Sequence, residues 1–318
     1  MFTEKFLKYE LSKIPDPVMR YLSLEKVTNT IVKQIEKNEK FIYDETSAKQ
    51  TMESVCHQNK NTEDYKCHLL EFEDGNFALS RIRLYRIGSQ YMHFVDILQK
   101  SFDIIEGNLL TELMEETFKK YQIFDPKGIC FVETSDMDFD RACNIVCQCQ
   151  FVTGHINTIR KLNKPERYDE VTLEQTQELN FYEQYVSEYE LLKSENEIYE
   201  NDVIAETTDS LKKAISNGHM FKIKINGKLA GIIAAERLNV NFYCGYCIKE
   251  EILFKDFRRQ NFGPALQRKM IDSILASDDE FIYGIISPLN TASLRTAKKC
   301  GRIAAGGDYY IKFNNKNL

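Results

Sequence analysis

The sequence lacks a long apolar run. No stretch of its 318 residues approaches the ~18 consecutive apolar residues that a membrane-spanning helix needs. The opening Met1-Phe-Thr-Glu-Lys-Phe-Leu-Lys8 also lacks the apolar core of a secretory signal peptide. We therefore expect a soluble, cytoplasmic protein that has no membrane partner and is not exported by the general signal-peptide route.

A metal-binding motif is missing as well. Cys244-x-x-Cys247 has no second cysteine pair at zinc-ligand spacing, and the Cys147-x-Cys149 spacing is poor for zinc. The nine cysteines are odd in number and spread over a long chain, which does not suit a disulfide framework. We expect buried, reduced thiols and no metal ion.

An excess of positive charge is absent too. The chain has 42 lysines and arginines against 48 aspartates and glutamates, which gives a net charge of −6 and a pI near 5.6. This balance argues against nucleic acid as a partner. Because the basic residues gather in one loop, the composition suits a polyanionic cofactor and an amine-bearing co-substrate.

What the sequence does contain is a repeated order of elements. At about 150 residues per domain, the length suggests two domains. A hairpin is predicted around the turn Asp74-Gly75 and another around Asn226-Gly227, and the two turn glycines lie 152 residues apart. Each hairpin precedes a predicted strand, helix, strand and helix, at 91–98, 108–121, 128–132 and 139–149, then at 246–254, 264–276, 281–286 and 291–300.

We interpret this order as an internal duplication, with a boundary near the polar segment Asn163-Lys-Pro-Glu-Arg167. Two unrelated domains that share an order of elements are the alternative.

One stretch, from Phe254 to Ile271, combines three features. An apolar strand enters a loop that contains Arg258 and Arg259, and an amphipathic helix opens at Pro264. The free N–H groups at a helix start, together with the helix dipole, form a site for a pyrophosphate. An ordinary strand-to-helix connection with a solvated basic loop is the alternative.

A second motif follows the predicted strand 281–286. It is Asn290-Thr-Ala-Ser293-Leu-Arg-Thr-Ala297-Lys-Lys-Cys-Gly301. The two motifs together resemble the GNAT N-acetyltransferase superfamily. Members of that superfamily carry R/Q-x-x-G-x-G/A after the fourth strand and N-x-x-S/A-x-x-x-A-x-x-x-G after the fifth.

The first motif fits in two registers, Arg258-x-x-Asn261-x-Gly263 and Gln260-x-x-Gly263-x-Ala265. We prefer the former because Leu266 follows Gly263 by three residues, as a leucine does in the family. It places Asn261 where the family has glycine, and asparagine tolerates a positive φ better than most residues.

The resemblance implies an α/β (α+β) fold of two tandem GNAT-like units, residues 1–163 and 164–318. Each is expected to have a central mixed, mostly antiparallel sheet flanked by helices. The N-terminal unit is expected to be degenerate, because its counterpart of the basic loop carries Asp103 and Glu106, which repel phosphates. Its last predicted helix has Asp140 near the position of Asn290.

The resemblance also implies a site for acetyl-CoA, which in the family lies where the fourth and fifth strands separate. The pantetheine arm is expected on the backbone of Glu251, Ile252, Leu253, Phe254 and Lys255. The pyrophosphate is expected on Arg258, Arg259, Gln260, Asn261, Phe262, Gly263, Pro264 and Ala265. Asn290 is expected at the pantetheine or at the attacking amine, and the helix from Ser293 beside the CoA arm.

Acetyl transfer needs a base that takes the proton of the amine. Glu250 and Glu251 are consecutive in the fourth strand, so their side chains point to opposite faces and at most one faces the substrate. We expect that one to be the base. In the alternative, one carboxylate faces solvent and the other pairs with Lys249 or Arg258.

The departing thiolate needs a proton donor. Many family members have a tyrosine seven residues after the motif asparagine, and that position is Ala297 here. The catalytic acid is therefore expected to be Tyr309, Tyr310 or Tyr283, or water.

The sequence thus predicts an N-acetyltransferase that moves an acetyl group from acetyl-CoA to a primary amine of a small molecule or protein, by direct attack in a ternary complex. A CoA-binding regulatory or scaffold protein without turnover is one alternative. A translocated effector that acetylates a host protein is another. We expect a monomer or homodimer, and no motif identifies the amine.

Overall fold

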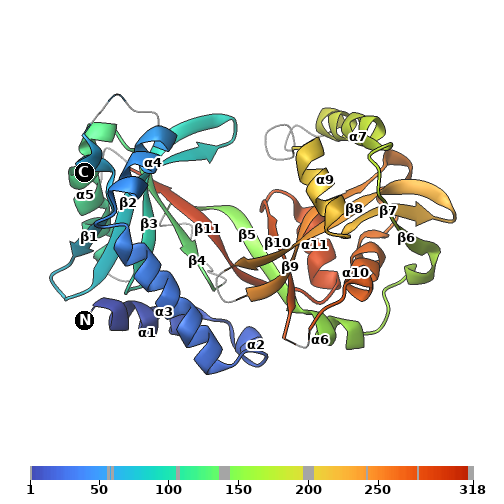
Figure 1. Cartoon of the computed structure of the whole chain (residues 1–318), viewed down its shortest axis with the longest axis horizontal. Helices are drawn as coiled ribbons and strands as arrows, with labels where there is room; N and C mark the ends of the chain where they lie inside the picture. Colours follow the sequence, from blue (N-terminus) through green and yellow to red (C-terminus); the bar gives the residue numbers. More distant parts are fainter. Residues whose placement is uncertain are drawn as a thin grey trace. The chain divides into compact units, whose positions relative to one another are not determined.

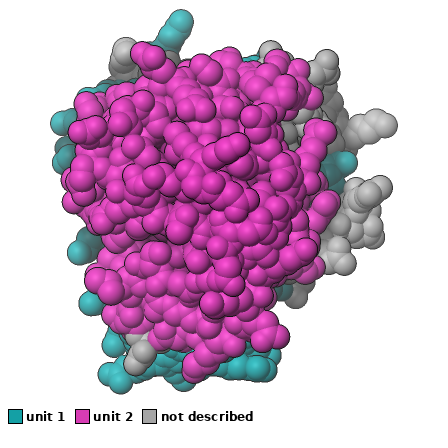
Figure 2. All heavy atoms as spheres, turned by 90° about the vertical axis from the view of Figure 1, so that its right-hand side faces the viewer, with its two compact units in different colours: residues 1–150, 305–318 teal, residues 151–304 magenta. Residues whose placement is uncertain are grey.

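A computed structural model describes residues 2–55, 58, 61–104, 108–135, 144–195, 204–240, 243–277 and 279–313 (Figure 1). The chain divides into two compact units, coloured separately in Figure 2. Unit 1 comprises Met1–Gln150 and Ala305–Leu318, and unit 2 comprises Phe151–Ala304. The sequence predicted a boundary between the two halves at residue 163. In the structure the boundary follows Gln150, and segment 305–318 belongs to unit 1. None of the described helices is long and apolar enough to cross a membrane.

Helices open unit 1. They are α1 (Phe2–Lys13), α2 (Asp16–Met19), α3 (Leu24–Lys40) and α4 (Glu45–Val55), followed by the short turn η1 (Thr62–Tyr65). In α3, Val27, Ile31 and Ile35 are buried at helical spacing, so one face of this helix packs inward. The side chain of Ser23 caps α3 by accepting the backbone N–H of Lys26. Later in the unit come α5 (Leu109–Tyr121) and η2 (Gln122–Phe124).

The sheet of unit 1 has the strand order β1-β2-β3-β4-β11. These strands are β1 (His68–Glu71), β2 (Phe77–Ile87), β3 (Gln90–Lys100), β4 (Gly128–Glu133) and β11 (Ile303–Lys312). All neighbouring pairs are antiparallel except β3 with β4, which is parallel. The last strand pairs with β4 from Gly307 opposite Glu133 to Lys312 opposite Gly128. This pairing is the reason that the C-terminal segment belongs to unit 1.

Unit 2 repeats this plan. The strand β5 (Ile145–His155) leads the chain from unit 1 into unit 2. The elements that follow are α6 (Ile156–Lys161), η4 (Tyr168–Glu170), β6 (Val171–Gln175), α7 (Tyr182–Glu195), α9 (Thr208–Ser216), β7 (Met220–Ile225), β8 (Lys228–Val240), β9 (Tyr243–Leu253), η5 (Lys255–Phe257), α10 (Gly263–Ser273), β10 (Phe281–Ile286) and α11 (Thr291–Lys299). The strand order is β6-β7-β8-β9-β10, and only β9 with β10 is parallel.

The two faces of the unit 2 sheet are covered by different helices. Ile232 and Ala234 of β8 are buried in a cluster with side chains of α7 and α9. Ile233 and Ala235, which alternate with them, are buried in a cluster with side chains of α10. The sheet therefore has α7 and α9 on one face and α10 on the other.

The predicted fold class is confirmed, since each unit has a mixed, mostly antiparallel sheet flanked by helices. The order strand, turn, strand, strand, helix, parallel strand occurs as β1-β2-β3-α5-β4 and again as β7-β8-β9-α10-β10. The helix predicted at 139–149 is wrong, because residues 145–155 form β5. The run Ile-Val-Cys-Gln-Cys-Gln-Phe-Val suits a half-buried strand. Glu106 and Asp140 lie outside the described residues.

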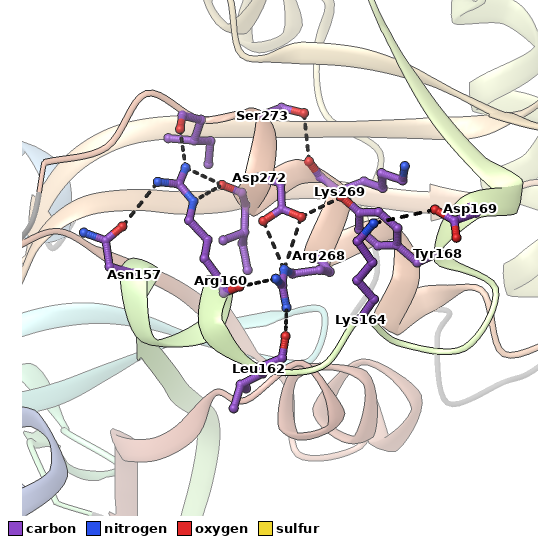
Figure 3. Close-up of polar contacts among 12 residues, drawn as sticks. Asn157, Arg160, Leu162, Lys164, Tyr168, Asp169, Arg268, Lys269, Asp272 and Ser273 are labelled. Carbon is purple, nitrogen blue, oxygen red and sulfur yellow. Dashed lines mark hydrogen bonds and ion pairs between the residues drawn. The ribbon is translucent and has the colours of Figure 1, made fainter.

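A polar network holds α10 against the chain that precedes β6 (Figure 3). Arg268, which is 6% exposed, forms an ion pair with Asp272 at 3.0 Å and donates to the backbone carbonyl of Arg160. The guanidinium of Arg160 donates to the carbonyl of Ile271 at 2.7 Å, at the C-terminal end of α10. The hydroxyl of Tyr168 donates to Asp272 at 2.6 Å. These contacts fix the position of α10, whose first turn forms part of the candidate site.

Candidate active site in unit 2

The hydrogen-bonded ladder between β9 and β10 is short. It joins Gly245 to Phe281, Tyr246 to Ile282 and Cys247 to Tyr283. Residues 248–253 of β9, all of them described, have no partner on β10. On the other side of β9, the register with β8 shifts between Ala234 and Ala235, so Lys249 has no residue opposite it. The parallel pair therefore opens at the carboxyl ends of its strands.

A cavity of about 220 Å³ lies where the ladder stops. Residues 248–251 of β9 and 284–287 at the end of β10 line it, together with Asn290 and Ser293 at the start of α11. Tyr189 of α7 also lines this cavity. Predicted residues of the fourth strand and of the second motif thus meet at one site.

Glu250 lies in the wall of this cavity and is 4% exposed. The hydroxyl of Tyr189 donates to its Oε1 at 2.7 Å, and the hydroxyl of Tyr185 donates to its Oε2. Burial raises the pKa of Glu250 to about 7, while the hydrogen bonds from the two tyrosines oppose this rise by stabilising the ionised form. A carboxyl group with this pKa can take up and release a proton near neutral pH.

Glu251 points to the other side of β9. The side-chain amide of Gln267, on α10, donates to its Oε2 at 2.6 Å. The amide oxygen of Gln267 accepts a hydrogen bond from Nη2 of Arg302 at 2.5 Å. Burial raises the pKa of Glu251, and the hydrogen bond from Gln267 and the charge of Arg302 act against that rise. The two glutamates therefore face α7 and α10 respectively, which confirms that they point to opposite faces.

The loop before α10 has a backbone suited to anions. Arg259 has a φ of +59° and Asn261 a φ of +63°. The residues that follow them differ, because Gln260 does not have a positive φ and Phe262 has a φ of −76°. Such alternation turns successive N–H groups toward one concave side, and the free N–H groups of the first turn of α10 follow directly. Asn261 thus adopts the left-handed conformation expected where the family has glycine. Among the described residues, the exposed side chain of Arg259 has no partner.

Arg258 has a different environment. Its Nη2 pairs with a carboxylate oxygen of Glu188, on α7, at 2.7 Å, and its Nε donates to the carbonyl of Leu253 at 2.7 Å. The same oxygen of Glu188 accepts the backbone N–H of Lys255 at 2.9 Å. Arg258 therefore ties α7 to the end of β9, whereas Arg259 is an exposed cation of the loop. The contact between Arg258 and a pyrophosphate stays a prediction.

The middle of α11 packs against the start of α10. A Cβ atom at Gly263 would lie 2.8 Å from Oγ1 of Thr296, so this close approach requires glycine. The side-chain oxygen of Asn290 accepts the backbone N–H of Ser293 at 3.1 Å and caps α11. The two predicted motifs are therefore in direct contact.

The candidate acids lie elsewhere. Tyr309 and Tyr310 belong to β11 in unit 1, where Tyr309 stacks on Phe131 at a ring-centroid distance of 5.8 Å and Tyr310 meets Phe94 at 5.9 Å. Tyr283 is buried in β10. None of the three tyrosines lines the cavity. The pairing of β11 with β4 places Tyr309 and Tyr310 in the core of unit 1. The role of a tyrosine as the acid stays a prediction.

Four polar residues of the site were missed from the sequence. They are Tyr185, Tyr189, Gln267 and Arg302. The two tyrosines are four residues apart, so they share one face of α7, and this spacing is visible in the sequence. Gln267 belongs to a buried stretch of α10, and a polar residue on the buried face of a helix is a signal of a hydrogen-bonded site.

The corresponding place in unit 1 is occupied by the unit's own side chains. The parallel ladder there joins Val95 to Ile129, Asp96 to Cys130 and Ile97 to Phe131. Beyond it, Lys100 and Glu133 form a buried ion pair, at 4% and 1% exposure. Nζ of Lys100 also donates to the hydroxyl of Tyr9, on α1, at 2.7 Å. These contacts agree with a degenerate first unit, whose lack of CoA binding stays a prediction.

No protein-family model matches the chain, and no curated protein matches it in sequence. Many solved structures of similar fold are GNAT-family acetyltransferases. One, from Colwellia psychrerythraea, is 12% identical over 75% of this chain and 85% of that chain, with a TM-score of 0.43. A GCN5-related N-acetyltransferase from Sphaerobacter thermophilus is 11% identical over 84% and 90%, with a TM-score of 0.45. A tandem GNAT protein from the clavulanic acid biosynthesis pathway is 8% identical over 85% and 96%, with a TM-score of 0.40.

Proposed function

We propose that unit 2 is an N-acetyltransferase that moves an acetyl group from acetyl-CoA to a primary amine. The main support for this proposal is the environment of the Glu250 side chain. Its carboxyl group lies in the wall of a cavity between two separating parallel strands, burial raises its pKa to about 7, and two tyrosines donate hydrogen bonds to it. An anion-binding loop and a helix start lie directly after the same strand.

The residues of the loop fit a pyrophosphate. The alternating φ values from Arg259 to Phe262 direct backbone N–H groups to one side, and α10 adds the positive end of its dipole. Arg259 would supply a cation, and Asn290 and Ser293 would border the pantetheine arm. Acetyl-CoA would supply an activated acetyl thioester. The unpaired part of β9 would offer its backbone to the arm.

Glu250 would act as the base. A primary amine is mostly protonated near neutral pH and becomes a nucleophile only after it loses a proton. Because the pKa of Glu250 is about 7, its carboxyl group is ionised in about half of the protein molecules at a pH of about 7 and can accept this proton. The hydroxyls of Tyr185 and Tyr189 stabilise the ionised form. Ala297 stands at the position of the usual tyrosine, so water would protonate the leaving thiolate. Water is sufficient because the thiolate of CoA is a tolerable leaving group.

The proposal is tested by the release of free thiol from acetyl-CoA with a panel of primary amines. We expect release that depends on one class of amine, with acetylated amine appearing in equal amount. The variant Glu250→Gln should lose ~10²–10⁴-fold in the chemical step because it cannot accept a proton. Binding of CoA without thiol release for any amine would instead support a CoA-binding protein without turnover.

A further inference from the structure

Arg302 is the buried cation of the cavity wall. It is 3% exposed, lines the cavity, and follows directly on the last residue of the second motif. Its Nη2 donates to Gln267 at 2.5 Å. Its Nε and Nη1 are also buried, and among the described residues neither has a hydrogen-bond partner. Buried donors in folded proteins nearly always have a partner, so this pair is unusual.

The charge of Arg302 is also unpaired within the part of unit 2 that the structure describes. No carboxylate there forms an ion pair with its guanidinium. The nearest polar link to an acid runs through Gln267, whose amide separates Arg302 from Glu251. Burial lowers the pKa of Arg302, and the charge of Glu251 only partly opposes this. A buried guanidinium without an ion-pair partner is costly for the fold, and a ligand that supplies an anion would reduce this cost.

Gly284 leaves a notch beside this guanidinium. A Cβ atom at Gly284 would lie 3.0 Å from Nη1 of Arg302, which is a hydrogen-bonding distance for an N–H donor. Gly284 itself lines the cavity. A ligand oxygen that takes the place of the missing side chain would therefore meet the free donor of Arg302.

We infer that Arg302 and Gly284 form a carboxylate-binding subsite, so that a ligand of this cavity carries a carboxylate close to the reacting centre. The inference rests on the proposed function. The cavity wall, which Lys249 and Glu251 also line, then offers Glu250 to an ammonium group and Arg302 to a carboxylate. A carboxylate on the acyl group of the donor and one on the amine substrate have the same chemistry, and the experiment distinguishes these two sources.

The test uses the full-length protein and calorimetry. In the first arm, succinyl-CoA is compared with butyryl-CoA, which has the same chain length without the carboxylate. In the second arm, a series of amino acids is compared with the corresponding carboxamides in the presence of saturating CoA. We expect the carboxylate member to bind about 10- to 100-fold more tightly in one arm, as a charge-assisted contact provides.

Two variants connect this difference to the subsite. Arg302→Gln removes the charge, and Gly284→Ala fills the notch but keeps the arginine. Both should reduce the carboxylate preference to within twofold while the binding of the neutral member changes little. A change that only loosens the fold would weaken both members alike. Because Gly284→Ala leaves the network of Gln267 intact, it tests the inference even where Arg302→Gln does not fold.

Equal binding within each pair by the wild type would overturn the inference, as would a preference that persists in both variants. Failure of the proposed function gives a different result. A carboxylate preference without acyl transfer would keep the subsite and reject the transferase. Acyl transfer without any carboxylate preference would support the transferase and reject the subsite.

Discussion

Replacing Tyr189 by phenylalanine should move the pH dependence of the reaction. The substitution removes one hydroxyl group, which donates to Oε1 of Glu250 at 2.7 Å, and leaves the ring in its buried place on α7. That hydrogen bond stabilises the ionised carboxylate, so it holds the pKa of Glu250 below the value that burial alone would produce. Without it the pKa rises above about 7.

The size of the shift follows from the energy of the lost contact. A hydrogen bond to a charged group contributes about 1.5–3 kcal/mol, and one pKa unit corresponds to about 1.4 kcal/mol. The expected rise is therefore about 1–2 units. Tyr185 still donates to the other oxygen of Glu250, which places the shift toward the lower end of this range.

The assay is kcat/KM from thiol release between pH 5.5 and 10, with the best amine of the panel. The acidic limb of the profile, which reports ionisation of the base, should move upward by about 1–2 pH units in Tyr189→Phe. The matched control is Tyr182→Phe, on the same helix, whose hydroxyl donates to the carbonyl of Glu206 at 3.5 Å and does not contact Glu250. An unmoved limb in Tyr189→Phe, or an equal shift in the control, would refute the assignment of Glu250 as the base.

Three further predictions concern stability and cofactor binding. Folding raises the pKa of Glu250 from 4.5 to about 7, so the free energy of unfolding falls by up to about 3 kcal/mol as the pH rises through this window. Glu250→Gln lacks this loss, so in denaturant titrations its free energy of unfolding should increase by about 1–3 kcal/mol relative to the wild type between pH 4.5 and pH 8. Gly263→Ala should lower the free energy of unfolding by about 1–3 kcal/mol because its Cβ meets Thr296 at 2.8 Å, and adding Thr296→Ala should restore most of it. Calorimetry should show one CoA bound per wild-type chain. Arg259→Glu should weaken the binding free energy of CoA by about 1.5–3 kcal/mol, and an unchanged affinity would contradict the loop assignment.

The sequence predicted those local conformations of the candidate site that short-range rules decide. A turn glycine, a proline in the first turn of a helix and an asparagine that tolerates positive φ are local signals, and the hairpins and the loop at Asn261 formed as expected. Strand alternation likewise separated Glu250 from Glu251.

The rest depends on contacts between distant segments, which local patterns do not contain. Tyr185 and Tyr189 meet Glu250 across more than 60 residues of sequence, and Arg302 reaches Gln267 across 35. The segment 145–155 became a strand, and β11 paired with β4 although the two are far apart in the chain. That pairing places Tyr309 and Tyr310 in the core of unit 1.

We propose that Glu250, and not its neighbour Glu251, deprotonates the amine. The direct test compares single-turnover rates of acetyl transfer by Glu250→Gln and Glu251→Gln at pH 8, with the CoA affinity of each variant measured alongside. We predict a loss of ~10²–10⁴-fold for Glu250→Gln at unchanged CoA affinity, and a small loss for Glu251→Gln. Wild-type rates in Glu250→Gln, or the larger loss in Glu251→Gln, would contradict the assignment.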